Sequence, residues 1–181
     1  IGSRNLFREF TTVHRGTVKG GGVTRIGSDG LFMAYVHIAH DCQVGDAVIF
    51  ANNGTLAGHV EVGSFAHVGA LSAVHQFCHV GEYAFIGGGT IATKDCLPFM
   101  KTVGSRPARC FGPNTIGLER KGFSAERREA LKQAWRLLHH PKLTTSEARQ
   151  RIAAELVDSP DAMRVLAFID AAERGVILAR G

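Results

Sequence analysis

The sequence predicts a mainly β protein, a parallel β-helix followed by a small α-helical domain. Three observations support this fold class. Apolar residues recur at every sixth position through the first half of the chain, a proline-containing segment from residue 98 ends that repeat, and amphipathic patterns with helix caps follow Ser124. We therefore expect a β-helix over residues 1–97, a connector over 98–123 and a helical domain over 124–181.

The six-residue repeat is the main evidence for the β-helix. Steps of six meet apolar residues, here called anchors, at Ile26, Phe32, Ile38, Val44, Phe50, Leu56, Val62, Val68, Val74, Val80, Ile86 and Ala92. A period of six fits neither an α-helix nor a long strand, but it fits one short strand and one tight turn per repeat. Three such faces form one triangular coil, so the anchors predict four coils with apolar side chains inside.

The residues around the anchors predict the corners. The residue after an anchor is commonly small, and we expect it where a corner is tight, as at Gly27, Gly45 and Gly63. The same step continues upstream through Ile1, Phe7 and Val13. The segment "KGGGVTR" at 19–25 adds one residue before Ile26, which predicts a bulged corner loop.

The C-terminal part carries three helix signatures, after a connector that we expect to be irregular. Ser124 can cap a helix to about His139. The segment "TTSE" at 144–147 forms a capping box for a second helix to about Val157. Pro160 opens a third helix that ends near Gly175. The buried stripe expected on the third helix is Met163, Leu166, Ala167 and Ile169.

Composition narrows the class and the compartment. No apolar run approaches the roughly 20 residues of a membrane-spanning helix and no targeting segment is found, so we expect a cytoplasmic protein without an integral membrane segment. The cysteines form no CxxC pair, which predicts reduced thiols at Cys42, Cys78, Cys96 and Cys110. The net charge of +5 fits an acidic partner and plain solubility equally well. The chain starts at Ile1 within a repeat, as a fragment would.

Histidines gather beside one predicted face. Ile38, Leu56 and Val74 are 18 residues apart and should stack, and each is followed by a histidine. Adjacent coils lie about 4.8 Å apart, so we expect a polar strip about 10 Å long. The strip would contain His40, His59, His75 and Gln76, with His37 at the corner before it. Solvated surface is the alternative interpretation for each histidine alone.

Three chemistries compete for this strip. A zinc site is disfavoured because the ligands are widely spaced and Asp41 should point away from His40. A nucleophile at Cys42 is disfavoured because Cys42 and Cys78 lie near positions that usually hold small buried residues. A general base needs one histidine, a carboxylate to orient it and an oxyanion donor, which His40, Asp41 and the backbone amide of Gly58 or Ala57 would supply.

Five segments together resemble one enzyme family. The segments "VHRGTVKGGG", "HIAHDC", "LAGHV", "AVHQF" and "GLERKGF" resemble, in this order, the acyl carrier protein-dependent UDP-N-acetylglucosamine O-acyltransferases, which begin lipid A synthesis. The resemblance implies a homotrimer of left-handed β-helices with active sites between subunits, and no metal or organic cofactor. Complete members have further coils upstream, and those coils have no counterpart in this sequence.

The resemblance also implies residue roles. His40 would be the general base for the sugar 3-hydroxyl, Asp41 would orient it, and the Gly58 N–H would bind the oxyanion. The implied substrate-binding residues are His14, His37, His59, His75, Gln76, Gly88, Asn114, Arg120 and Lys121. Gly88 stands at the position that limits the acyl chain in the family, where glycine leaves the groove long and implies a preference for long 3-hydroxyacyl donors. Glu119 stands where the family commonly has a cation, which departs from its pattern.

The resemblance also implies the partners. These are UDP-N-acetylglucosamine and the acidic acyl carrier protein, and we expect no nucleic acid. The expected carrier-protein surface is Arg106, Arg109, Arg120, Lys121, Arg127, Arg128, Lys132 and Arg136, although these cations also fit a solvated helix face. Two other functions stay open: an N-acyltransferase of the same fold acting on an amino-sugar nucleotide, and a non-catalytic hexapeptide scaffold.

Overall fold

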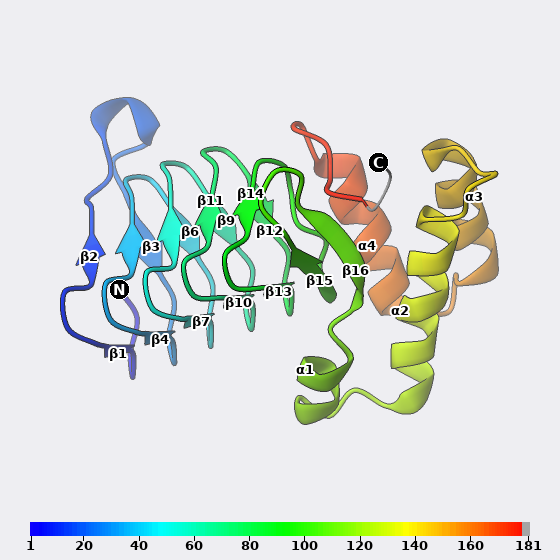
Figure 1. Cartoon of the computed structure of the whole chain (residues 1–181), viewed down its shortest axis with the longest axis horizontal. Helices are drawn as coiled ribbons and strands as arrows, with labels where there is room; N and C mark the ends of the chain where they lie inside the picture. The colour runs from blue at the N-terminus through cyan, green and yellow to red at the C-terminus, as the bar shows by residue number, and fades with distance from the viewer. Residues whose placement is uncertain (179–181) are drawn as a thin grey trace.

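A computed structural model describes residues 1–178 as a triangular β-helix with helices packed at one end (Figure 1). Three sheets form the faces of the prism, and their strands are parallel except for β16 at the end of sheet A. Sheet A contains β1 (Leu6–Phe7), β4 (Leu31–Phe32), β7 (Ile49–Phe50), β10 (His67–Val68), β13 (Phe85–Ile86), β15 (Met100–Val103) and β16 (Arg109–Pro113). Sheet B contains β2 (Thr12–Val13), β5 (His37–Ile38), β8 (Thr55–Leu56), β11 (Ala73–Val74) and β14 (Ile91–Ala92). Sheet C contains β3 (Arg25–Ile26), β6 (Gln43–Val44), β9 (Glu61–Val62) and β12 (His79–Val80).

The anchors fill the interior as predicted. All twelve are buried, with exposed fractions of 4% or less. Successive coils pair anchor with anchor, as Ile38 pairs with Leu56 and Leu56 with Val74. Phe7, Phe32 and Phe50 form an aromatic stack along the shaft, with ring centroids 4.6 and 5.3 Å apart. Because every coil buries the same positions, each coil provides the apolar surface for the next.

Two separate steric requirements apply at the corners, and they fall on different residues. Backbone φ is positive at the third residue after most anchors, where the side chain is commonly not glycine, as at Asp41, His59 and Phe77. The small residue directly after an anchor has a different cause. A Cβ at Gly45 would lie 2.7 Å from the Ser64 nitrogen, so the next coil approaches too closely for a side chain there.

The loop before Ile26 is longer than expected. Val13 pairs with Ile38, 25 positions later, whereas the other coils repeat after 18. The loop therefore adds seven residues to its coil, and the expectation of one added residue is wrong. It contains the short 3₁₀ helix η1 (Val18–Gly20), capped by the Thr17 hydroxyl, and projects from the first coil (Figure 1).

The expectation of an irregular connector over 98–123 is wrong. β15 extends sheet A by pairing parallel with β13, and β16 returns antiparallel to β15. Helix α1 (Thr115–Arg120) follows, with Asn114 as its N-cap. The open edge of β13 supplies hydrogen-bond partners to this segment, which local sequence preferences do not reveal.

The three predicted helices are present with the predicted caps. Helix α2 (Ala125–Leu138) starts after Ser124, α3 (Thr145–Glu155) has the Thr144–Glu147 capping box, and α4 (Pro160–Ala171) starts after Ser159. Helix α4 ends four residues before Gly175. Its buried face is centred on Ala162 and Val165, while Ala167 is exposed, so that part of the expected stripe is wrong.

The helices enclose a second apolar core, separate from the shaft of the β-helix. It joins β15 and β16 to the helices and includes Leu97, Phe99, Met100, Leu118, Leu131, Leu138, Ile152 and Val165. Division of the chain into units at 97 and 123 stays a prediction. Within residues 1–178 no helix is long and apolar enough to cross a membrane.

Candidate active site

The predicted base and carboxylate are in direct contact. His40 and Asp41 follow β5 at the corner between sheets B and C, and His40 Nδ1 lies 2.8 Å from Asp41 Oδ2. The Asp41 side chain is buried, with an exposed fraction of 1%, whereas the His40 side chain is 40% exposed. The expectation that Asp41 points away from His40 is wrong. The arrangement is a solvent-accessible imidazole that rests on a buried carboxylate.

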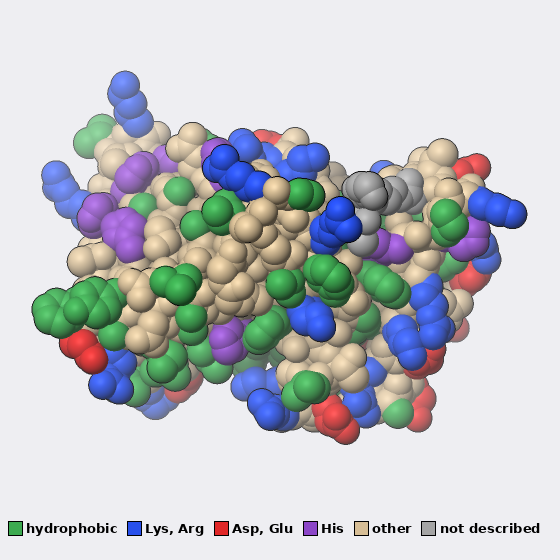
Figure 2. Space-filling view, in the orientation of Figure 1, with side chains coloured by type: hydrophobic (Ala, Val, Ile, Leu, Met, Phe, Trp, Pro, Cys, Tyr) green, Lys and Arg blue, Asp and Glu red, His purple; other side chains and the backbone are tan. Residues whose placement is uncertain are grey.

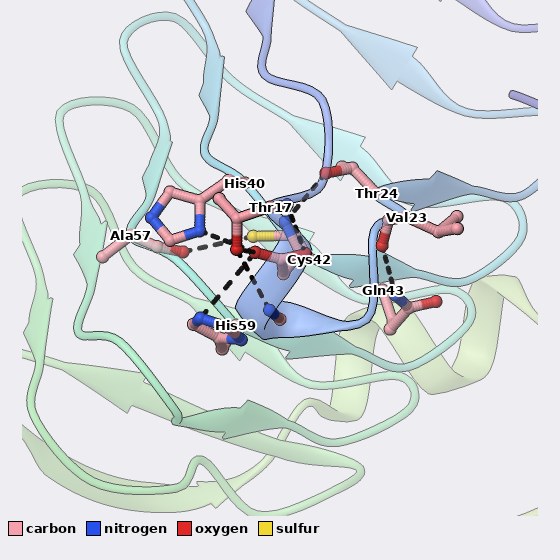
Figure 3. A network of polar contacts seen from close by, with 10 residues as sticks. Thr17, Val23, Thr24, His40, Cys42, Gln43, Ala57 and His59 are labelled. Carbon is pink, nitrogen blue, oxygen red and sulfur yellow. Dashed lines mark hydrogen bonds and ion pairs between the residues drawn. The ribbon is translucent and has the colours of Figure 1, made fainter.

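Asp41 is held by the long loop. The Thr17 N–H donates to Asp41 Oδ1 at 2.9 Å and the Thr17 hydroxyl donates to Oδ2 at 2.7 Å. The Thr24 hydroxyl accepts the Asp41 backbone N–H at 2.8 Å, and Figure 3 shows Thr17, Thr24 and His40 around this point. Burial alone raises the pKa of Asp41. The hydrogen bonds from Thr17 and His40, with the charge of His59, outweigh burial and lower that pKa to about 2.

The state of Asp41 determines the tautomer of His40. A carboxylate with a pKa of about 2 is ionised near neutral pH and can only accept hydrogen bonds. His40 Nδ1 must therefore carry the proton that joins it to Asp41, and Nε2 keeps its lone pair. A neutral imidazole with a free Nε2 is the form that accepts a proton from a hydroxyl.

Gly58 lies against the ring of His40. A Cβ at Gly58 would be 2.6 Å from His40 Cε1 and 2.8 Å from Nε2, so a side chain at this position would collide with the imidazole. Within residues 1–178 the Gly58 N–H has no hydrogen-bond acceptor, whereas the N–H groups of Ala57 and His59 donate to Val74 and His40. A free donor beside the base is the arrangement that an oxyanion requires.

His59 completes this group. Its ring meets His40 edge to face at 5.2 Å between centroids, stacks on Phe77 at 4.5 Å, and brings Nε2 to 3.8 Å from Asp41 Oδ2. His40, Asp41 and His59 each offer a ligand atom within 4.8 Å of the others, so these residues could hold a metal ion. However, Thr17 and His40 already occupy the Asp41 oxygens.

The predicted polar strip is divided into smaller groups. His75 and Gln76 are exposed, and within residues 1–178 no contact joins His75 to His40 or His59. His37 instead pairs edge to face with His14 at 4.7 Å between ring centroids, and its Nδ1 is hydrogen-bonded to the Thr12 hydroxyl at 2.8 Å. Burial and the neighbouring His14 lower the pKa of His37. Figure 2 shows histidines gathered on the β-helix half of the visible face.

The four cysteines lie in the interior of the protein. Cys42, Cys78, Cys96 and Cys110 are all free and buried. The Cys42 thiol donates to the Ala57 carbonyl at 3.1 Å, and burial raises its pKa. A thiol with a raised pKa is a poor nucleophile near neutral pH, which agrees with the preference for a core cysteine over a catalytic one.

A separate cavity of about 530 Å³ lies over sheet A and α1. The implied substrate-binding residues Asn114, Arg120 and Lys121 line it, together with Ile49, His67, Phe85 and Ile116. Within one chain this cavity and His40 belong to different parts of the prism, since His40 follows a strand of sheet B. A single chain therefore does not bring Asn114, Arg120 and Lys121 beside His40.

Known proteins are similar to this chain over nearly its whole length. A family model described as "Udp N-acetylglucosamine O-acyltransferase; Domain 2" matches residues 95–177. An acyl-[acyl-carrier-protein]--UDP-N-acetylglucosamine O-acyltransferase from Anaeromyxobacter dehalogenans is 48% identical over 176 residues, which cover 97% of this chain and 68% of the relative. The chain belongs to the UDP-N-acetylglucosamine O-acyltransferase family.

Solved structures of this acyltransferase family have the same fold. LpxA from Acinetobacter baumannii has a TM-score of 0.92 and 41% identity over 97% of this chain and 68% of its own. A UDP-N-acetylglucosamine acyltransferase from Campylobacter jejuni has a TM-score of 0.92 and 39% identity over 99% and 70%. The predicted left-handed parallel β-helix with C-terminal helices is thereby confirmed.

The basic surface of this acyltransferase family member is partly neutralised. Carboxylates pair with four of its predicted cations: Arg127 with Asp161, Arg128 with Glu119, and Lys132 and Arg136 with Glu129. Lys121 lies over the Phe65 ring at 5.0 Å. Within residues 1–178, the members of this predicted set without a carboxylate partner are Arg106, Arg109, Arg120 and Lys121.

Sequence reasoning missed Thr17 and Thr24, and it did not predict that Gly20 lies against Asp41. The segment "VHRGTVKGGG" contains Thr17 and Gly20, but only its His14 was assigned to the substrate site. A Cβ at Gly20 would lie 2.3 Å from Asp41 Cγ, so this glycine permits the loop to close over the carboxylate. The available signal was a threonine within a segment that the family resemblance already marked.

Proposed function

We propose that the chain transfers a 3-hydroxyacyl group from acyl carrier protein to the 3-hydroxyl of UDP-N-acetylglucosamine, the first step of lipid A biosynthesis, in the cytoplasm. One observation carries this proposal: an exposed imidazole contacts a buried, ionised carboxylate, and the Gly58 N–H beside its ring has no acceptor among the described residues. Family membership supports the choice of donor and acceptor, because the relatives are named for both.

The geometry suggests the following mechanism. His40 Nε2 removes the proton of the sugar hydroxyl as its oxygen attacks the thioester carbonyl carbon. Asp41 stabilises the imidazolium that forms, and the Gly58 N–H donates to the oxyanion of the tetrahedral intermediate. The C–S bond then breaks, and the departing thiolate takes the proton from His40. Every proton is returned, so no cofactor is required.

We propose that the working unit is a homotrimer. The cavity beside Asn114 and Arg120 lies over sheet A, away from His40, and a second copy that sets its sheet A against the His40 corner would complete a cleft. The outside of the prism also exposes large apolar side chains at Leu6, Phe10, Tyr35 and Leu71, with exposed fractions of 57, 69, 55 and 70%. Such a surface is typical of an interface between subunits.

A direct assay tests the function. The chain is incubated with 3-hydroxyacyl carrier protein and either UDP-N-acetylglucosamine or its 3-amino analogue, and products are identified by mass spectrometry. We expect the O-acyl product from the 3-hydroxy sugar, its loss in His40→Ala, and normal turnover in the control His140→Ala, which changes a histidine of the helical part. Preference for the 3-amino sugar would indicate the N-acyltransferase, and no turnover of either would favour the scaffold.

A further inference from the structure

The inserted loop, residues 14–24, closes over one residue of the candidate dyad. Thr17 contacts the Asp41 carboxylate, Thr24 accepts the Asp41 backbone N–H, and Gly20 leaves room for the carboxylate beneath the loop. These partners are 17 to 24 positions from Asp41 in the sequence. The insertion therefore buries the carboxylate that His40 rests on.

Thr17 engages both oxygens of that carboxylate. Its N–H reaches Oδ1 at 2.9 Å and its hydroxyl reaches Oδ2 at 2.7 Å, while His40 Nδ1 reaches Oδ2 at 2.8 Å. Two donors from one residue on two oxygens prevent rotation of the carboxylate about its Cβ–Cγ bond. The oxygen that faces His40 is thus held at a fixed place in a buried setting, where charged hydrogen bonds are strong.

We propose that Thr17 is a positioning residue of this active site, and that its hydroxyl holds Asp41 in the orientation that keeps His40 in its Nδ1–H tautomer. The role of Thr17 in catalysis rests on the proposed function, whereas its role in setting the tautomer does not. The Thr17 N–H and hydroxyl both donate to Asp41, and the hydroxyl oxygen accepts the Gly20 N–H, so Thr17 is neither the base nor the oxyanion donor itself. Its effect is exerted through Asp41.

A purely structural role is the competing explanation, since the Thr17 hydroxyl also accepts the Gly20 N–H and so caps η1. The two roles separate by substitution. Thr17→Val keeps the shape and the backbone N–H but removes the hydroxyl, and Thr17→Ser keeps the hydroxyl. Thr11→Val is a matched control, because Thr11 belongs to the same coil as Thr17 and, within residues 1–178, its hydroxyl bonds only the Met33 carbonyl of the next coil, at 3.3 Å.

The first measurement is turnover by the full chain. We expect Thr17→Val to lower kcat by about 10- to 100-fold, the size typical of a lost hydrogen bond to a charged group, with KM for the nucleotide sugar within about twofold. Thr17→Ser should recover kcat to within about threefold of the wild type, and Thr11→Val should not change it. A purely structural role predicts instead that losses of kcat follow losses of thermal midpoint across the variants.

The second measurement needs no turnover. Nitrogen-15 spectra of labelled histidine, recorded at about pH 8, where imidazole is mainly neutral, report which ring nitrogen carries the proton. We expect the His40 Nδ1–H form in the wild type and Thr17→Ser, and a mixture with the Nε2–H form in Thr17→Val. An inactive wild-type chain with this tautomer pattern would contradict the proposed function but keep the role of Thr17. An unchanged His40 tautomer in Thr17→Val would overturn the role of Thr17.

Discussion

Gly58→Ala tests whether the space beside the imidazole is essential. The added Cβ would lie 2.6 Å from His40 Cε1, and ordinary contact begins at about 3.4 Å, so the ring must retreat by about 0.8 Å. His40 is tied to Asp41 by a 2.8 Å hydrogen bond, so this retreat bends or breaks the contact that sets its tautomer. A misplacement of about 1 Å in a catalytic group can lower the rate by about 10²-fold.

We therefore expect Gly58→Ala to lower kcat by about 10²-fold while the chain stays folded. The assay is steady-state turnover of 3-hydroxyacyl carrier protein and UDP-N-acetylglucosamine, with thermal unfolding measured in parallel. Gly54→Ala is the control, because a Cβ there would lie 3.1 Å from the Ala51 carbonyl and outside the site. A kcat for Gly58→Ala within about threefold of the wild type would refute the proposed placement of His40 against Gly58.

Four further predictions concern other parts of the chain. His40→Ala should lower kcat by about 10²- to 10⁴-fold because it removes the proposed base. The thermal midpoint should change little, because the His40 side chain lies outside the shaft of the β-helix. Near-normal turnover would contradict the role of His40 as base. The pKa of Asp41 in the folded chain, about 2, is below its usual value, so the ionised carboxylate should stabilise the fold above about pH 4 and lose this effect as the pH falls toward 2. The urea midpoints of the wild type and of Asp41→Asn should therefore converge over that range. A constant difference between the two midpoints would contradict the lowered pKa. Arg127→Ala should destabilise the fold by about 1 to 2 kcal/mol in urea unfolding, because it leaves the buried Asp161 carboxylate without the two hydrogen bonds that Arg127 donates. An unchanged midpoint would contradict this expectation and would indicate that Arg164, whose Nη1 lies 3.9 Å from Asp161 Oδ1, is a sufficient partner for the carboxylate. Gly88→Met should shift the preferred acyl donor to shorter chains, measured as kcat/KM over a series of donor lengths, and an unchanged optimum would place the length limit elsewhere.

The β-helix was predictable because its determinants are local and repeated. Every coil buries the same positions, so the same signal recurs at all twelve anchors. A polar residue at one anchor would not hide the six-residue period. The helix caps at Ser124, Thr144 and Ser159 were also predictable, since each cap bonds an amide within three residues of itself. Such short-range interactions are visible in the order of residues alone.

The segments that were predicted incorrectly depend on distant partners. β15 is a strand because the edge of β13 is open beside it, and the length of the loop before Ile26 was apparent only from the pairing of Val13 with Ile38. Helix α4 is buried through Val165 because α2 and α3 pack against it. None of these causes lies within the segment itself.

The sequence by itself determined the period, the inward anchors and the helix starts, and it led to the hypothesis that His40 and Asp41 act as base and orienting acid. Only the tertiary structure decided that Asp41 turns back onto His40, that Thr17 holds both of its oxygens, and that Gly58 lies against the imidazole. The physical reason is the sequence separation over which each interaction acts. Burial and capping act between neighbours in the chain, whereas hydrogen bonds to a buried carboxylate come from whichever loop the coils bring beside it, here one that is 24 residues away.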